Sequence, residues 1–294
     1  MFPAPFDYHD PTSTEEAVAL LSQYGSDARP LAGGQTLVAA MNLGLVRPGV
    51  IVDLNRVHEL ERIERLDGAL VLGALLRQRF LEDSAEVASS CPLLGAAAAL
   101  IGNARVRSRG TLGGSLAHAD PAAELPAAML ALEAEFRVAG PGARRTVPAA
   151  DFFLGPLSTA LHDDELLIEV QIPAQPARTG WAFEEVARRP GGFAIVGAAA
   201  LVSLAEDGSV LKTRLAIAGA GPVPERARSA EAMLSGAQPR PALLAEAANV
   251  AADELEVTSD ALVSAQYRRH LVGVLAARAL ARALDRAAAE AVPA

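Results

Sequence analysis

Cysteine is almost absent from this chain: Cys91 is one residue among 294. One thiol cannot close an internal disulfide bond, and it cannot hold an iron–sulfur cluster, which takes several protein ligands. Cys91 precedes Pro92 in an apolar stretch, which favours a buried structural thiol over a reactive one. The chain is therefore expected to depend on neither disulfides nor clusters of its own.

Metal-ligand spacings are also missing. The histidines are scattered at positions 9, 58, 118, 162 and 270, and no two have the H-E-x-x-H spacing or a similar one. His118 and Asp120 come nearest to a ligand pair, but no third ligand lies nearby in the sequence. We expect no metal site and no catalytic metal chemistry in this chain.

Net positive charge and long apolar runs are absent as well. A formal net charge of −9 argues against a nucleic-acid partner. No apolar run approaches the roughly 20 residues that span a bilayer, so no membrane span is expected. Residues 1–5 show neither the charged nor the apolar region of a signal peptide. These features predict a cytoplasmic protein.

The sequence does contain two paired-glycine segments, at residues 31–37 and 109–116. In each, glycines let backbone N–H groups turn toward one point, and a short hydroxyl residue follows, as in concave anion sites. A lone Gly-Gly is more often a plain turn, and neither segment is a Rossmann or P-loop motif. Two such segments about 80 residues apart suit a ligand with two phosphates, such as a dinucleotide.

Local signals predict alternating helices and strands over the first part of the chain. Ser13 and Glu16 form a capping box for a helix at 12–25 that Gly25 ends. Asp67-Gly68 predicts a β-hairpin. The other expected elements are strands at 29–32, 50–54, 134–139 and 166–172 and helices from Thr36, at 84–101 with a break possible at Pro92, and at 121–133.

The composition changes at residues 173–180, which are poor in large apolar side chains and predict a domain boundary. Beyond this boundary, three antiparallel strands are expected at 181–188, 193–204 and 210–218. Helices are expected at about 226–235, 240–254 and 261–288. The pattern predicts an α+β protein with domains at 1–175 and 176–294.

Several motifs occur in a fixed order: Ala-Gly-Gly-Gln-Thr-Leu at 32–37, Val-Asp-Leu-Asn at 52–55, Gly-Thr-Leu-Gly-Gly-Ser at 110–115 and Ala-Asp-Pro-Ala-Ala-Glu-Leu-Pro at 119–126. Further matches lie at Arg188-Arg189, Gly192-Phe193-Ala194 and Tyr267-Arg268-Arg269. Over almost its whole length the chain resembles the FAD-binding medium subunit of the molybdenum hydroxylases. That family includes carbon monoxide dehydrogenase, xanthine dehydrogenase and bacterial N-heterocycle dehydrogenases.

The resemblance implies a two-part FAD-binding domain of the vanillyl-alcohol-oxidase (PCMH) type at 1–175. It also implies a smaller C-terminal α+β domain of the CO dehydrogenase flavoprotein type at 176–294, with a three-stranded antiparallel sheet and helices. The positions matched to FAD binding are Leu31, Ala32, Gly33, Gly34, Gln35, Thr36 and Leu37 around the pyrophosphate, Thr111, Leu112, Gly113, Gly114 and Ser115 facing them, Ile101 and Leu167 as apolar walls, Asp120 as a polar contact, and Phe193 near the isoalloxazine.

The chain departs from its relatives at a few of these positions. Thr36 stands where many relatives carry Ser, and Ser115 stands where others carry Asn. Some relatives place Lys near 184, where this chain has Glu184-Glu185. Phe193 replaces the Tyr of some relatives, so it can stack but cannot hydrogen-bond. A plain core Phe at the start of a strand is the alternative interpretation of Phe193.

No acid/base pair or nucleophile constellation is evident, so no catalytic residue is assigned. The resemblance implies an FAD-carrying electron-transfer subunit, an oxidoreductase component of an (αβγ)2 complex of heterotrimers. A molybdopterin large subunit would hydroxylate the substrate, and a small subunit with two [2Fe–2S] clusters would pass electrons to FAD and on to an external acceptor. Two alternatives are a stand-alone flavin-dependent reductase or oxidase of the same fold, and a non-enzymatic assembly subunit that has lost FAD.

Overall fold

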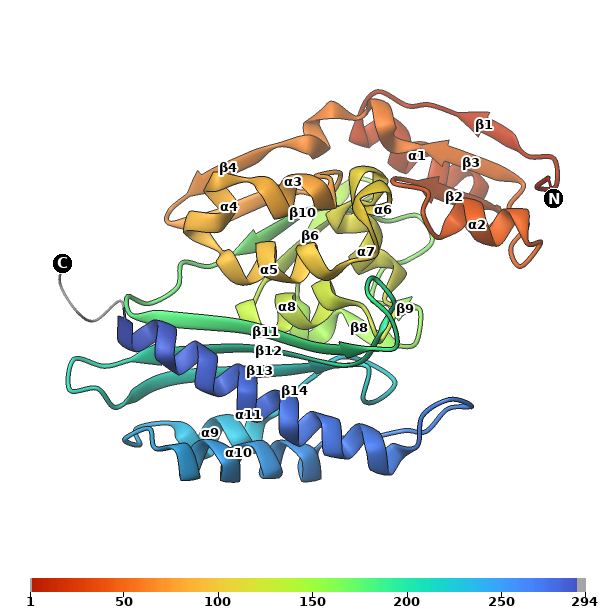
Figure 1. The fold of residues 1–294 in the computed structure, drawn as a ribbon. Coiled ribbons are helices and arrows are strands. Elements are labelled where there is room, and N and C mark those ends of the chain that lie inside the picture. The colour runs from red at the N-terminus through yellow and green to blue at the C-terminus, as the bar shows by residue number, and fades with distance from the viewer. Residues whose placement is uncertain (1, 290–294) are drawn as a thin grey trace.

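The computed structural model describes residues 2–289, and Figure 1 shows them as stacked layers of sheets and helices. The N-terminal layer is a parallel sheet of order β1-β3-β2 with helices α1 and α2. Ser13 accepts a hydrogen bond from the Glu16 amide, and Gly25 (φ 52°) ends α1, as predicted, but the Glu16 carboxylate accepts from the Thr12 amide and not from that of Ser13, so the capping box is confirmed only in part. The bounds are β1 Asp7–His9, α1 Thr14–Tyr24, β2 Ala28–Leu31, α2 Leu37–Asn42 and β3 Val50–Asp53.

The second sheet is antiparallel, with strand order β4-β5-β10-β6-β7. Asp67 and Gly68 take positive φ (51° and 82°) between β4 and β5, which confirms the predicted hairpin. The bounds are β4 Ile63–Leu66, β5 Ala69–Gly73, β6 Glu135–Gly140, β7 Ala143–Pro148 and β10 Leu166–Ile172, with a separate two-stranded pair, β8 Phe153–Gly155 and β9 Ser158–Thr159. Short 3-10 turns lie at Gly25–Asp27, Leu54–Arg56, His58–Glu61 and Ala149–Asp151.

A layer of helices lies between β5 and β6 in sequence. Pro92 separates α4 from α5, as expected. The helix predicted from residue 121 begins later, at Glu124, because the Asp120 carboxylate accepts a hydrogen bond from the Ala122 amide and holds a turn there. The bounds are α3 Gln78–Asp83, α4 Ala85–Ser90, α5 Pro92–Leu100, α6 Ala104–Arg109, α7 Leu112–His118 and α8 Glu124–Leu132.

The C-terminal sheet is antiparallel, with order β11-β12-β13-β14. The three expected strands are present, but the prediction of a three-stranded sheet is wrong because a fourth, two-residue strand pairs with β13. Helices α9, α10 and α11 cover one face of this sheet (Figure 1). The bounds are β11 Thr179–Ala187, β12 Ala194–Leu204, β13 Val210–Ala218, β14 Glu225–Arg226, α9 Arg228–Leu234, α10 Pro241–Glu254 and α11 Ala265–Ala289.

The opposite face of the C-terminal sheet packs against α5 and α8, so the two halves of the chain share a core. Trp181, Phe183 and Leu201 join the apolar cluster that contains the α5 and α8 side chains. At the end of α8, the Glu133 carboxylate accepts hydrogen bonds from Lys212 and Arg226 of the C-terminal sheet. This docking fixes where the turns of the C-terminal domain lie relative to the glycine segments.

Candidate functional site

The structure brings the two paired-glycine segments into direct contact. A Cβ at Gly33 would lie 2.8 Å from the Gly110 Cα and nearer still to the Arg109 carbonyl oxygen. A Cβ at Gly114 would lie 3.7 Å from that of Ala32. Because no side chain separates these backbones, residues about 80 positions apart in the sequence form one surface.

The first segment leaves its backbone donors free. It begins at Leu31, the last residue of β2, takes positive φ at Gly34 (72°), and reaches α2 through Thr36, whose side chain does not cap the helix. Within residues 2–289 no hydrogen-bond acceptor is found for the amides of residues 33–37. The partial positive charge of the α2 N-terminus adds to these donors, so the segment suits a phosphate.

The second segment does not form the open glycine loop that the sequence predicts. Residues 112–118 form α7, and Thr111 caps it by accepting a hydrogen bond from the Gly114 amide at 3.1 Å. The Leu112 and Gly113 amides donate to the carbonyls of Leu76 and Ala74. The expectation of a second loop with free donors is therefore wrong. Glycine is needed at 113 because a Cβ there would lie 2.6 Å from the Ala74 Cβ.

Two side chains that sequence reasoning did not assign to the site hold the segments together. The Asn55 amide nitrogen donates to the Ala32 carbonyl at 3.0 Å. Arg77 donates to the Asn55 side-chain oxygen at 2.6 Å and to the Arg109 carbonyl at 2.7 Å. Burial, and then the nearby Arg109 charge, lower the pKa of Arg77. Asn55 belongs to the Val-Asp-Leu-Asn motif, which was the available signal, whereas nothing in the sequence marked Arg77.

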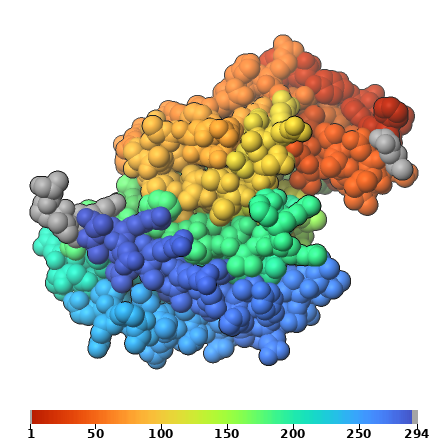
Figure 2. Space-filling model, in the orientation of Figure 1, coloured from red at the N-terminus to blue at the C-terminus, as the bar shows by residue number. Residues whose placement is uncertain are grey.

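The C-terminal domain reaches this site through the β11–β12 turn, residues 188–193, which rises toward α6 and α7 (Figure 1). A Cβ at Gly191 would lie 2.8 Å from the Gly102 carbonyl carbon, so the turn touches the residue after Ile101. Phe193 is 64% exposed, which overturns the alternative interpretation of a core side chain. Figure 2 shows that the surface steps inward on this side, where the N-terminal lobe projects beyond the C-terminal domain.

The remaining predicted site residues differ in accessibility. Gln35, Thr36 and Gly114 are exposed, and Leu31, Leu37, Ile101, Ser115 and Asp120 are half-buried. Thr111 and Leu112 are buried, and Leu167 lies in the core of the first domain. Thr111, Leu112 and Leu167 are therefore not open to a ligand in this arrangement.

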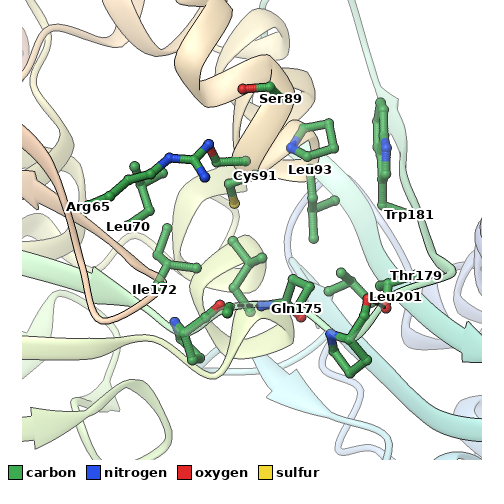
Figure 3. A pocket seen from close by; sticks show the side chains of 17 residues that line it. Arg65, Leu70, Ser89, Cys91, Leu93, Ile172, Gln175, Thr179, Trp181 and Leu201 are labelled. Carbon is green, nitrogen blue, oxygen red and sulfur yellow. Dashed lines mark hydrogen bonds between the residues drawn. The ribbon is translucent and has the colours of Figure 1, made fainter.

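A separate cavity of about 290 Å³ lies at the other end of the domain interface (Figure 3). Leu132, at the C-terminal end of α8, lines it, whereas the glycine segments lie beyond the opposite end of that helix. Cys91 forms part of its wall and is buried, as expected. Burial raises the pKa of the Cys91 thiol to about 12, so it stays protonated and unreactive at neutral pH.

Two kinds of feature are absent from the part of the chain that the structure describes. No group of three His, Cys, Asp or Glu side chains in residues 2–289 is arranged to hold a metal ion. In the same residues, no helix is both long enough and apolar enough to cross a membrane.

Comparison with known proteins identifies the class to which this fold and site belong. The FAD-binding domain of molybdopterin dehydrogenases matches residues 4–175, and the CO dehydrogenase flavoprotein C-terminal domain matches residues 181–283. The chain therefore belongs to the family of FAD-binding subunits of molybdopterin dehydrogenases. This result confirms the expected family and fold class.

Particular relatives are similar over nearly their full lengths. The chain is 39% identical over 287 residues to the 6-hydroxypseudooxynicotine dehydrogenase complex subunit alpha of Paenarthrobacter nicotinovorans, covering 98% of this chain and 97% of the relative. It is 38% identical over 288 residues to the carbon monoxide dehydrogenase medium chain of Hydrogenophaga pseudoflava, covering 98% and 100%. A solved structure of carbon monoxide dehydrogenase from that organism superposes with a TM-score of 0.94 at 40% identity, covering 97% of this chain and 99% of the other.

Proposed function

We propose that this chain is the FAD-carrying electron-transfer subunit of a molybdopterin-dependent hydroxylase or dehydrogenase complex. The observation that carries the proposal is the meeting of the two glycine segments at one surface in a chain of this family. Bound FAD supplies the redox chemistry, and the protein supplies binding, orientation and electrostatics. This chain has one cysteine, so the iron–sulfur clusters that deliver electrons belong to a partner.

The residues present fit a dinucleotide. The free amides of residues 33–37 would donate to the pyrophosphate, and the bare backbone at Gly33 lets the second segment pack directly against the first. Ser115 and Thr36 would add hydroxyl groups. Ile101 and the exposed ring of Phe193 would enclose the isoalloxazine, and Asp120 would supply a polar contact.

The domain boundaries and the partner subunits are inferred from the same family membership. We infer that the FAD-binding domain comprises residues 1–175 and the C-terminal domain residues 176–294. The partners would be a molybdopterin-binding large subunit and a small subunit with [2Fe–2S] clusters, in an (αβγ)2 assembly. The relatives are named for different substrates, 6-hydroxypseudooxynicotine and carbon monoxide. We infer that the large subunit sets the substrate of this complex.

The test is to purify the chain alone and then with its partners. We expect a yellow protein with one FAD per chain that is inert toward organic substrates and takes electrons from the iron–sulfur partner. Turnover of an organic substrate by the isolated chain would favour a stand-alone flavoenzyme instead. A colourless chain that binds no added FAD would contradict the proposal.

A further inference from the structure

The side chains of β11 alternate between two different partners. Trp181 and Phe183 pack against the core of the first domain, and Ala182 belongs to the core of the C-terminal domain. Glu184 points to the C-terminal side as well, because its carboxylate accepts a hydrogen bond from Arg282 of α11 at 2.5 Å. The two-residue period of a strand therefore directs Glu185 toward the first domain.

The cross-strand neighbours of Glu185 are small, and the ring of Phe183, two residues earlier on β11, lies over the nearest of them, Gly197. Glu185 pairs with Gly197 on β12, and Gly197 pairs with Ala218 on β13. The Gly219 amide donates to the Pro121 carbonyl at 2.8 Å, which holds the segment before α8 against the end of β13. The first residue of α8, Glu124, is thus brought toward the same row of small residues.

Glu124 is a buried carboxyl without a cation. It is 4% exposed, and its own backbone amide is the hydrogen-bond donor that favours its charged form. Burial, and then the charges of Glu185 and Asp120, raise the pKa of Glu124 to about 8. These two carboxylates are the charged groups that face it from the adjoining elements.

Glu185 is also unpaired. Its Oε2 atom is buried with no hydrogen-bond partner among the described residues. Burial raises the pKa of Glu185 to about 7. Glu124 keeps its proton to higher pH, because it is the more deeply buried of the two and the charge of Glu185 adds to that effect. An uncompensated charge in such surroundings is unfavourable, so near neutral pH the pair retains protons.

The pair lies on the side of the candidate site where the flavin ring is proposed to bind. The turn that follows Glu185 contacts Gly102, next to Ile101, and carries the exposed Phe193. Asp120, a proposed polar contact, lies four residues before Glu124.

We propose that Glu124 and Glu185 form a carboxyl pair beside the isoalloxazine whose negative charge makes bound FAD harder to reduce as the pH rises. The inference rests on the proposed function. Each ionisation releases one proton to water and forms no bond to the cofactor. The resulting negative charge opposes the arrival of electrons on the nearby ring, strongly so in a poorly hydrated recess. Both glutamates therefore act on the flavin through their charge, without touching the reacting atoms.

The test uses the full chain loaded with FAD. The reduction potential of bound FAD is measured between about pH 6 and about pH 9, a range that brackets both pKa values. We expect the potential to fall more steeply with pH in the wild type than in Glu185→Gln or Glu124→Gln. Glu184→Gln is the matched control, because that side chain faces α11, and its slope should equal that of the wild type.

A second readout does not depend on electron transfer. The visible spectrum of the oxidised protein should shift with a transition between about pH 6 and about pH 9, and Glu185→Gln should move or abolish it. The inference would be overturned if the reduction potential of bound FAD fell with pH at the same slope in all variants, or if the wild-type spectrum showed no transition in that range. Neither result would contradict the proposed FAD binding. Failure of the wild type to bind FAD at all would instead contradict the proposed function. If Glu124→Gln does not fold, the reduction potential of Glu185→Gln and the pH dependence of the wild-type spectrum still test the inference.

Discussion

Replacing Gly33 with alanine tests the contact on which the candidate site depends. The added Cβ would lie 2.8 Å from the Gly110 Cα and 3.0 Å from the Arg109 carbonyl carbon. Carbon atoms in contact normally lie about 3.5–4.0 Å apart, so the two segments must separate by roughly 0.7 Å or more. Both neighbours are backbone atoms, which cannot rotate away as a flexible side chain would.

We expect Gly33→Ala to lower the free energy of unfolding by about 1–3 kcal/mol, the usual effect of overpacking. We also expect FAD affinity to fall about tenfold or more, because the donors of residues 33–37 move relative to the second segment; tenfold corresponds to about 1.4 kcal/mol. Urea unfolding of the apoprotein and titration with FAD measure the two effects separately.

Gly273→Ala is the control for this prediction. A Cβ at Gly273 would lie 3.8 Å from that of Ala252, an ordinary contact in α11, a helix of the C-terminal domain. It should leave FAD affinity unchanged. If Gly33→Ala retains stoichiometric FAD with wild-type affinity and stability, the reasoning that close backbone approach builds the site is refuted.

Three further changes have defined outcomes. Phe193→Ala should leave the fold intact, because the ring is 64% exposed. It should alter the visible spectrum of bound FAD and the rate at which reduced FAD is reoxidised. A folded, FAD-loaded variant with neither change would exclude Phe193 from the flavin site. The Cys91→Ser protein should still accept electrons from the iron–sulfur partner. It should lose about 1–3 kcal/mol of stability, because a buried hydroxyl needs a hydrogen-bond partner. Loss of flavin reduction with FAD still bound would contradict a structural role for Cys91. Burial alone would raise the pKa of Glu133, but hydrogen bonds from Lys212 and Arg226 outweigh it and lower that pKa to about 2. The stability that Glu133 contributes is therefore full above its unfolded pKa, about 4.5, and is lost as the pH falls toward about 2. In urea unfolding, Glu133→Gln should be less stable than the wild type at neutral pH, with a smaller difference at about pH 3; a difference that is independent of pH would show that the ion pairs do not stabilise the domain contact.

Elements with a local chemical cause were predictable from the sequence. The Ser13 cap, the Asp67-Gly68 turn and the break at Pro92 each follow from residues adjacent to the feature. The family-level motifs added the identity of the ligand, which no local signal provides. The contact between the glycine segments was expected only through that resemblance.

Features that depend on tertiary packing were not predictable in the same way. Gly-Gly is unfavourable in a helix, yet α7 contains Gly113 and Gly114, because a Cβ at 113 would lie 2.6 Å from the Ala74 Cβ and one at 114 would lie 2.7 Å from the capping Thr111 hydroxyl. The same close approach consumes the backbone donors that the sequence pattern assigned to a phosphate. In this motif, glycine serves the approach of one backbone to another more than the binding of an anion.

The two glutamates of β11 show where local reasoning stops. A strand with one solvated face can carry carboxylates on that face at no cost, and Glu184-Glu185 in a sequence suggests such a strand. Here both faces are covered, one by α11 and one by the first domain, so each carboxylate needs a partner. Arg282 supplies one for Glu184, and nothing among the described residues supplies one for Glu185. Unpartnered buried polar groups of this kind are expected at functional sites, and the one at Glu185 arises only when the two domains dock.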